Sequence, residues 1–354
     1  MPAWQRTPRR LPTSCTFQTL AGNPMTSRPD GTLRRRSGFS IVEMLVAVTI
    51  LIILITITLS VMDSTSSLWR RSSESIEAFQ SARLGFDLMT RELSQATLNT
   101  YLDYDDPSNP TIYRRRSDLH FVCGPAGAGS LPGTPNTGSA IFFQAPIAYT
   151  QNTAQLGILD GPLNVCGFYI KFGTDPTLPP FASGQQRYRY RLMNLLVPTE
   201  DNRVYDNTGA LATQFSWFND YIDKSDFPVA DNVIALVVRP EDPADPNLFP
   251  TLDYNSLDRW KANPQPITAN QLPPLLNVTM VAIDETSARR MENGSAPPAA
   301  ITSALASFQN RINSNAADIS TALDELGAAL SAKNIKYRIF SSKVPMRESK
   351  WTRN

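Results

Sequence analysis

The side chains that most often perform enzyme chemistry are scarce in this sequence. There is a single histidine, His120, inside the run DLHFV, and we interpret it as a histidine packed in a strand or at its edge. The sequence contains no G-x-S-x-G serine turn, Walker phosphate loop, H-E-x-x-H zinc helix or C-x-x-C pair. We therefore predict that the protein is not an enzyme and has no catalytic residue and no cofactor.

The remaining candidate ligands are an acidic run and two cysteines. Asp103, Asp105 and Asp106 could bind calcium through oxygen, but the run lacks the glycine and distal glutamate of an EF-hand loop. We favour a solvated loop there and predict no metal site. Cys123 and Cys166 could form a disulfide outside the cytoplasm, or they could be two unrelated buried thiols.

One carboxylate, Glu43, stands just inside a long apolar run. A charge in such a stretch costs a few kcal/mol toward the membrane centre unless it is paired, so it usually marks function. Glu43 follows Phe39 by one helical turn. A cut between Gly38 and Phe39 would create an α-amino group that could neutralise Glu43 in its own chain or in a neighbour. Alternatively, the carboxylate could reach the cytoplasmic headgroups.

The apolar run itself predicts a membrane span. The nineteen residues from Met44 to Met62 carry no charge, and as a helix they would be roughly 28 Å long, close to the thickness of a bilayer core. Seven arginines lie before Gly38, against one acid, Asp30. The positive-inside rule then predicts a single-pass inner-membrane protein with a cytoplasmic N-terminus and a periplasmic head. The net charge of +1 gives no reason to expect nucleic acid as a partner.

The residues SGFSIVEMLVAVTILIILI resemble the N-terminus of type IV prepilins and pseudopilins. In that family, a membrane prepilin peptidase cuts after the leader's final glycine and methylates the new phenylalanine amine. The resemblance implies that Gly38 ends the leader, that Phe39 is the methylated N-terminus and that Glu43 is the assembly carboxylate. It also implies that the partners are the prepilin peptidase, other pilin-like subunits and the inner membrane.

Two features depart from the usual family pattern. The leader, residues 1–38, is longer than usual, and initiation at Met25 instead of Met1 would leave a more ordinary 14 residues. Many major pilins have a kinking proline in the first helix, whereas this sequence has none between Phe39 and Asp106.

Three further segments follow the leader. We expect a transmembrane helix over 39–62 that continues as an amphipathic helix over 63–100, with a total length of roughly 90 Å. The apolar residues of the second part recur every three or four positions: Ile76, Phe79, Ala82, Phe86, Met89, Leu93 and Ala96. Pro107 and its neighbours in NTYLDYDDPSNP should end the helix.

Short β-branched and aromatic runs dominate residues 101–354 and predict a head of antiparallel strands packed on the helix. The runs are DLHFVC, SAIFFQAP, NVCGFYIKF, RYRYRLMNLLVP, NVIALVVRP, LLNVTMVAID and the closing YRIFSSKVP. In YRYRL, alternating tyrosines and arginines indicate a strand with one solvated face. A helical insertion is expected at about 301–332, interrupted near NSNAAD. The fold class is therefore α+β.

Longer stretches extend the resemblance. The order and proportions of the segments resemble the minor pseudopilin J class of type II secretion systems. FQSARLGFDLMTRELSQATLNTYLDYDDP, YRYRLMNLLVPTE and KYRIFSSKVPMRESKW resemble the pilin-like Verru_Chthon cassette protein C family more closely. These resemblances imply a pseudopilin-like role, either in a type II secretion-like pseudopilus or in a short type IV-like filament.

Two functions from different classes follow. The first is a structural, pilin-like subunit that is processed after Gly38 and assembled through Glu43. The second is a signal-anchored periplasmic ligand-binding protein or enzyme that keeps its N-terminus. The second predicts no cleavage at Gly38 and tolerance of Glu43→Ala.

Overall fold

The structure is a computed structural model that describes residues 40–127, 129, 131–174, 187–206, 214–245, 248–314 and 318–352, without the side chains of 70–78. The chain divides into two compact units, residues 1–64 and 65–354. The predicted leader, 1–38, lies outside the described residues.

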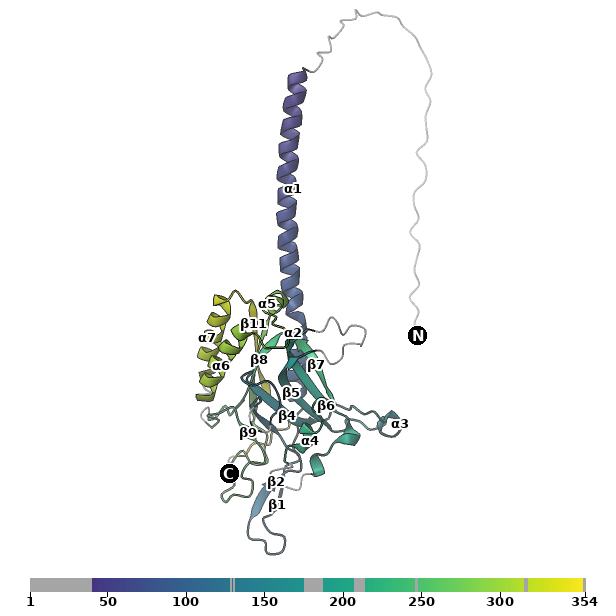
Figure 1. Ribbon diagram of the computed structural model, residues 1–354. Coiled ribbons are helices and arrows are strands. Elements are labelled where there is room, and N and C mark those ends of the chain that lie inside the picture. The colour runs from purple at the N-terminus through teal and green to yellow at the C-terminus, as the bar shows by residue number, and fades with distance from the viewer. Residues whose placement is uncertain are drawn as a thin grey trace, which may run out of the picture. The chain divides into compact units, whose positions relative to one another are not determined.

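The first described element is the helix α1, Ile41–Ala78 (Figure 1). Its portion Ile41–Trp69 is the one described helix that is long and apolar enough to cross a membrane. Every side chain from Ile41 to Trp69 is exposed. A helix that is apolar all round is expected where lipid or other helices surround it.

A second helix, α2, spans Gln80–Leu93. The prediction of one uninterrupted helix to about residue 100 is wrong in two respects. The helix breaks at Phe79, whose backbone has φ −102° and ψ 0°, and it ends at Leu93. Beyond that end, the Thr97 amide donates to the Gln144 carbonyl at 2.9 Å, so the chain already runs along the head.

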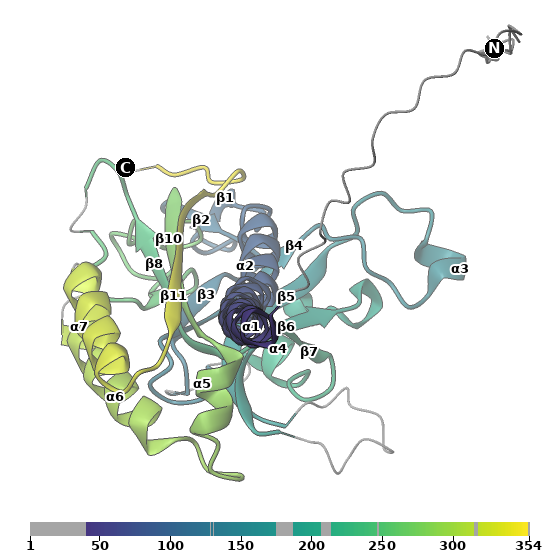
Figure 2. The same ribbon diagram turned by 90° about the horizontal axis from the view of Figure 1, so that it is seen from above.

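The amphipathic pattern of α2 is confirmed. Ala82, Phe86, Met89 and Leu93 are all buried, and they pack between the two main sheets of the head. Figure 2 shows strands on both sides of α2. Gly85 allows this close approach, because an added Cβ would lie 3.0 Å from the Ala230 Cβ.

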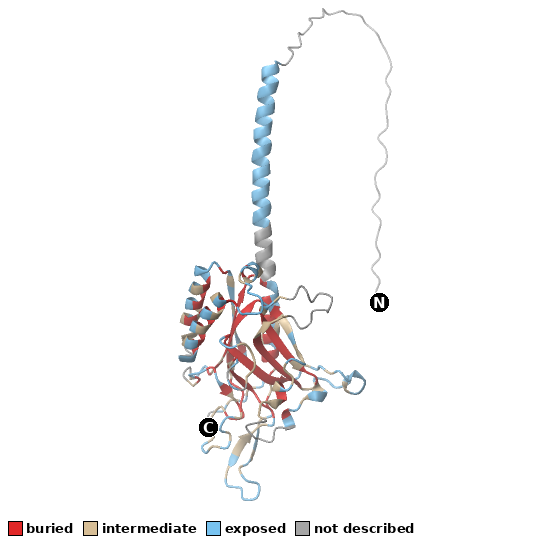
Figure 3. Ribbon diagram, viewed as in Figure 1, coloured by how far each residue is buried: buried red, intermediate tan, exposed pale blue. Residues whose placement is uncertain are grey.

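The predicted antiparallel, β-rich head is confirmed. The larger sheet has the order β7-β6-β5-β4-β3-β9, and all its pairings are antiparallel. Its strands are β3 Val122–Pro125, β4 Ser139–Ala145, β5 Asn164–Gly173, β6 Arg189–Val197, β7 Asp226–Asp231 and β9 Tyr254–Asn255. All of β4 and most of β5 and β6 are buried, as the red strands of Figure 3 show.

The second sheet has the order β11-β10-β8 and is also antiparallel. Its strands are β8 Val233–Glu241, β10 Leu275–Ile283 and β11 Tyr337–Pro345. The two sheets meet where Gly138 forms a bridge with Leu236. Gly138 has φ +98°, and a Cβ there would lie only 1.9 Å from the Leu236 carbonyl oxygen, so the junction requires glycine.

The helical insertion forms two helices, α6 Ala299–Ser314 and α7 Ile319–Ala332, which pack beside the second sheet (Figure 2). Shorter elements complete the described head: α3 Thr153–Leu156, η2 Thr199–Asp201, η3 Val204–Asp206, α4 Ser216–Asn219 and α5 Glu285–Arg290. A separate ribbon pairs β1 Tyr101–Tyr104 with β2 Tyr113–Arg116. That ribbon occupies a stretch for which the sequence predicted only a loop.

Candidate processing and assembly segment

The segment singled out by the sequence lies at the start of α1. Gly38 and Phe39 are outside the described residues. The Met44 amide donates to the Ser40 carbonyl at 3.1 Å, so helical hydrogen bonding begins at Ser40. Glu43 stands in the first turn and is exposed. A carboxylate in the first turn interacts favourably with the positive end of the helix dipole.

The three threonines between Ile41 and Met62 all donate their hydroxyls to carbonyls of the same helix. Thr49 donates to Val46 at 2.8 Å and Thr58 to Leu54 at 2.6 Å. Thr56 makes equivalent bonds to Ile52 and Ile53. Internal satisfaction of polar groups is what a bilayer demands. Glu43 is the single ionisable residue between Ile41 and Met62.

Comparison with known protein families gives one result that bears on this segment. Residues 33–59 match the prokaryotic N-terminal methylation motif. The match supports a type IV pilin-like protein. The motif implies processing by a prepilin peptidase and assembly with other pilin subunits, and it agrees with a membrane-anchored chain. Comparison with curated protein sequences and with solved structures gave no match.

The two cysteines of the head do not pair. Cys123 lies on β3 and Cys166 on β5, with β4 between them, and both are free and buried. Strands two positions apart are separated by about 9–10 Å, beyond the roughly 7 Å Cα separation that a disulfide tolerates. The disulfide considered from the sequence is therefore not formed. Burial raises the pKa of both thiols, so they stay protonated at neutral pH.

Each of the three aspartates of the acidic run has its own ion-pair or hydrogen-bond partners. Asp103 pairs with Arg116 at 2.7 Å across the β1–β2 ribbon. Asp105 accepts bonds from the Thr111 amide and hydroxyl, and Asp106 accepts from the Ser108 amide at 2.8 Å. These carboxylates shape a hairpin loop, and none of them belongs to a cluster that could hold a metal among the described residues.

His120 is a packed histidine, as predicted, although it lies just before β3. The Trp217 indole N–H donates to its Nδ1 at 3.0 Å, so Nε2 carries the proton and bonds the Asn255 Oδ1 at 2.8 Å. Burial lowers the pKa of His120 to about 4. A neutral, fully buried imidazole with both nitrogens occupied is a structural group.

Sequence reasoning missed an ion-pair cluster that joins the two sheets. Glu285, at the start of α5, receives a two-pronged bond from Arg189 of β6, a bond from Arg289 at 2.6 Å and one from Asn232 at 2.9 Å. Burial acts to raise the pKa of Glu285, but these hydrogen bonds outweigh it and hold the pKa at about 2.

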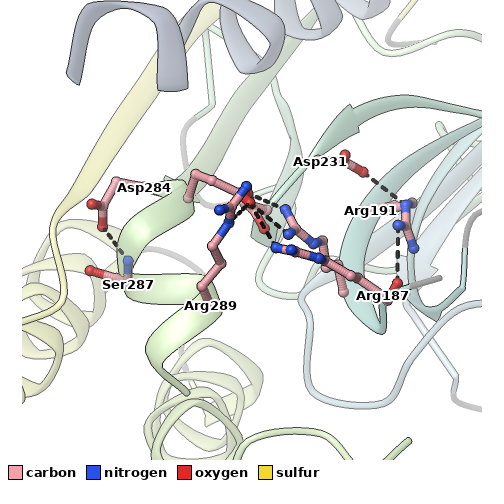
Figure 4. Close-up of polar contacts among 9 residues, drawn as sticks. Arg187, Arg191, Asp231, Asp284, Ser287 and Arg289 are labelled. Atoms are coloured by element: carbon pink, nitrogen blue, oxygen red, sulfur yellow. Dashed lines mark hydrogen bonds and ion pairs between the residues drawn. The ribbon is translucent and has the colours of Figure 1, made fainter. Parts of the chain in front are cut away.

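The neighbouring Arg191 is buried and pairs with Asp231 of β7 at 2.8 Å, as Figure 4 shows. The solvated face predicted for YRYRL is therefore wrong, because Arg189 and Arg191 face carboxylates from other elements. The one sequence feature that could have indicated this cluster is the set of three arginines at alternate positions, Arg187, Arg189 and Arg191. Their acidic partners lie far along the chain.

Proposed function

We propose that this protein is a non-enzymatic, pilin-like subunit of a type II secretion-like pseudopilus or short type IV-like filament. In this proposal, a prepilin peptidase cuts after Gly38 and methylates Phe39. The arginines before α1 stay in the cytoplasm, and the head lies in the periplasm. The observation that carries the proposal is the methylation motif at residues 33–59 together with Glu43 in the first turn of α1.

The apolar surface of α1 supports membrane storage followed by helix packing. The side chains of Ile41–Trp69 are all exposed, so lipid covers them first and neighbouring helices cover them in a filament. Exchange of lipid for protein contacts has little hydrophobic driving force. Such contacts also leave the axial register of one helix against the next weakly specified.

Glu43 supplies the missing specificity. Cleavage at Gly38 would place an amine one turn before Glu43, and the Glu43 of one subunit would pair with the amine of its neighbour. A charge buried without its partner costs about 3–5 kcal/mol, which corresponds to a factor of roughly 10² to 5 × 10³ in the equilibrium constant of a subunit contact. One charged pair in an otherwise apolar bundle therefore fixes the register.

The test compares Glu43→Ala with Thr49→Ala in cells that contain the prepilin peptidase and the companion pilin-like proteins. Both positions are exposed on α1, and the Thr49 hydroxyl bonds only within its own helix. We expect both variants to be processed at Gly38, and only Glu43→Ala to drop out of cross-linked oligomers. Wild-type oligomer yield from a processed Glu43→Ala chain would refute the assembly role.

A further inference from the structure

Two features project from the head, and they are complementary in charge and in apolar surface. One is the loop that carries α3, between β4 and β5, and the other is the β1–β2 ribbon. In Figure 1 the α3 loop projects to the right of residues 65–354 and the β1–β2 ribbon projects below them. A loop and a groove on different sides of one unit can meet only between two copies.

The tip of the α3 loop presents an apolar knob, residues Ile158–Asp160. Ile158 is 87% exposed, the highest value among the large hydrophobic residues that the structure describes, and Leu159 is 55% exposed. Asp160 follows directly and is also exposed. Exposed aliphatic side chains at a loop tip add nothing to the core of their own chain, and they are accessible to a second molecule.

The base of this loop is held firmly. The Glu200 carboxylate accepts bonds from the amides of Gln151 and Asn152 at 2.8 and 2.9 Å and from the Thr150 hydroxyl at 2.9 Å. The Asn152 side chain in turn caps α3 by accepting from the Gln155 amide. A loop fixed in this way loses little conformational entropy when its tip binds.

The groove lies beside the β1–β2 ribbon and has a volume of about 730 Å³. Its lining combines exposed apolar side chains with positive charge. Leu102 and Tyr113 are 68% and 66% exposed, and Arg114, Arg115 and Lys350 also line it, with no acidic residue among the lining side chains.

Two of the groove's cations, Arg114 and Arg115, donate to main-chain carbonyls. Arg114 donates to the Ala262 carbonyl at 3.2 Å and Arg115 to the Pro266 carbonyl at 2.8 Å. These bonds fix the guanidinium groups but leave their charge. Within the described residues, no carboxylate forms a salt bridge with Arg114, Arg115 or Lys350.

We propose that the apolar knob Ile158–Asp160 of one copy docks in the β1–β2 groove of a second copy, with Ile158 and Leu159 against Leu102 and Tyr113 and Asp160 among the three cations. Because the two surfaces differ, the contact is heterologous and can repeat from copy to copy, as an open assembly requires. This contact between heads rests on the proposed function as a filament subunit.

The test is disulfide cross-linking of the full-length chain in membranes, with Cys15→Ser in every variant. Cys123 and Cys166 are buried and need no change. Ile158→Cys on one tagged copy and Leu102→Cys on another should give a dimer on mild oxidation. The matched control replaces Leu102→Cys by Leu84→Cys, because Leu84 is 70% exposed but lies on α2.

We expect at least a roughly tenfold higher dimer yield from the Ile158/Leu102 combination than from the control. Asp160→Lys should abolish the excess, and Lys350→Glu in the partner copy should restore part of it. Equal yields from the two combinations, or a yield that Asp160→Lys leaves unchanged, would overturn the proposal.

The mass of the same samples reports cleavage at Gly38 independently. An uncleaved chain that still gives the specific dimer would refute the proposed function and leave the head contact intact. A cleaved chain without the dimer would refute the head contact alone.

Discussion

Replacement of Glu285 by glutamine should weaken the junction between the two sheets. The carboxylate is one third exposed, whereas its main partner Arg189 is only 10% exposed. The substitution therefore leaves a mostly buried guanidinium without its directly paired carboxylate. A fall in the pKa of Glu285 from 4.5 to about 2 corresponds to about 3 kcal/mol. Solvent screening at a side chain one third exposed reduces this to about 2 kcal/mol.

The assay is thermal unfolding of the detergent-solubilised full-length chain. A loss of about 2 kcal/mol should lower the Tm by roughly 4–8 °C. Asp87→Asn is the matched control, because Asp87 and Arg83 form an exposed pair at 3.9 Å, for which no measurable change is expected.

The pH dependence of the protein's stability provides a second test of the same cluster. Because the folded-state pKa of Glu285 is depressed, its contribution is fully present above pH 4.5 and is lost as the pH falls toward 2. The difference in stability between wild type and Glu285→Gln should therefore shrink across that window. Equal Tm shifts for Glu285→Gln and Asp87→Asn, or a difference that does not change below pH 4.5, would refute this account of the junction.

Three further predictions concern the core of the head. Burial raises the pKa of Glu92, so its ionisation costs stability as the pH rises above 4.5. Glu92→Gln should therefore raise the free energy of unfolding at pH 7 by about 1 kcal/mol and flatten its pH profile, measured by denaturant unfolding. A loss of stability at pH 7 would contradict this. Gly138→Ala should destabilise the head by about 3 kcal/mol or more and lower its Tm, because the Cβ of the alanine would collide with the Leu236 carbonyl. An unchanged Tm would contradict the close contact between the two sheets. Cys123 and Cys166 should both react with a thiol reagent only after unfolding, and reductant should leave the Tm unchanged; a mass lower by two hydrogens would indicate a disulfide.

The sequence was informative wherever local periodicity reflects burial. Six of the predicted runs in the head became β3, β4, β5, β6, β8 and β10, and the closing run became β11, because β-branched and aromatic residues between turn residues leave few alternatives. The buried side of α2 was equally predictable from its three- and four-residue spacing.

Properties that depend on distant partners could not be predicted. Glu285 and Arg189 are 96 positions apart, so nothing local distinguishes a paired arginine from a solvated one. The β1–β2 ribbon was missed because it is short, polar and held by cross-strand bonds such as Arg116 to Asp103. The break at Phe79 is likewise not encoded in any helix propensity.

The most direct test of the central claim is the intact mass and N-terminal sequence of the protein from membranes that contain its prepilin peptidase. The proposal predicts a chain that begins at an N-methylated Phe39. A chain that still carries Arg34 to Gly38 would contradict it, and it would leave a signal-anchored protein whose head must be assayed for ligands.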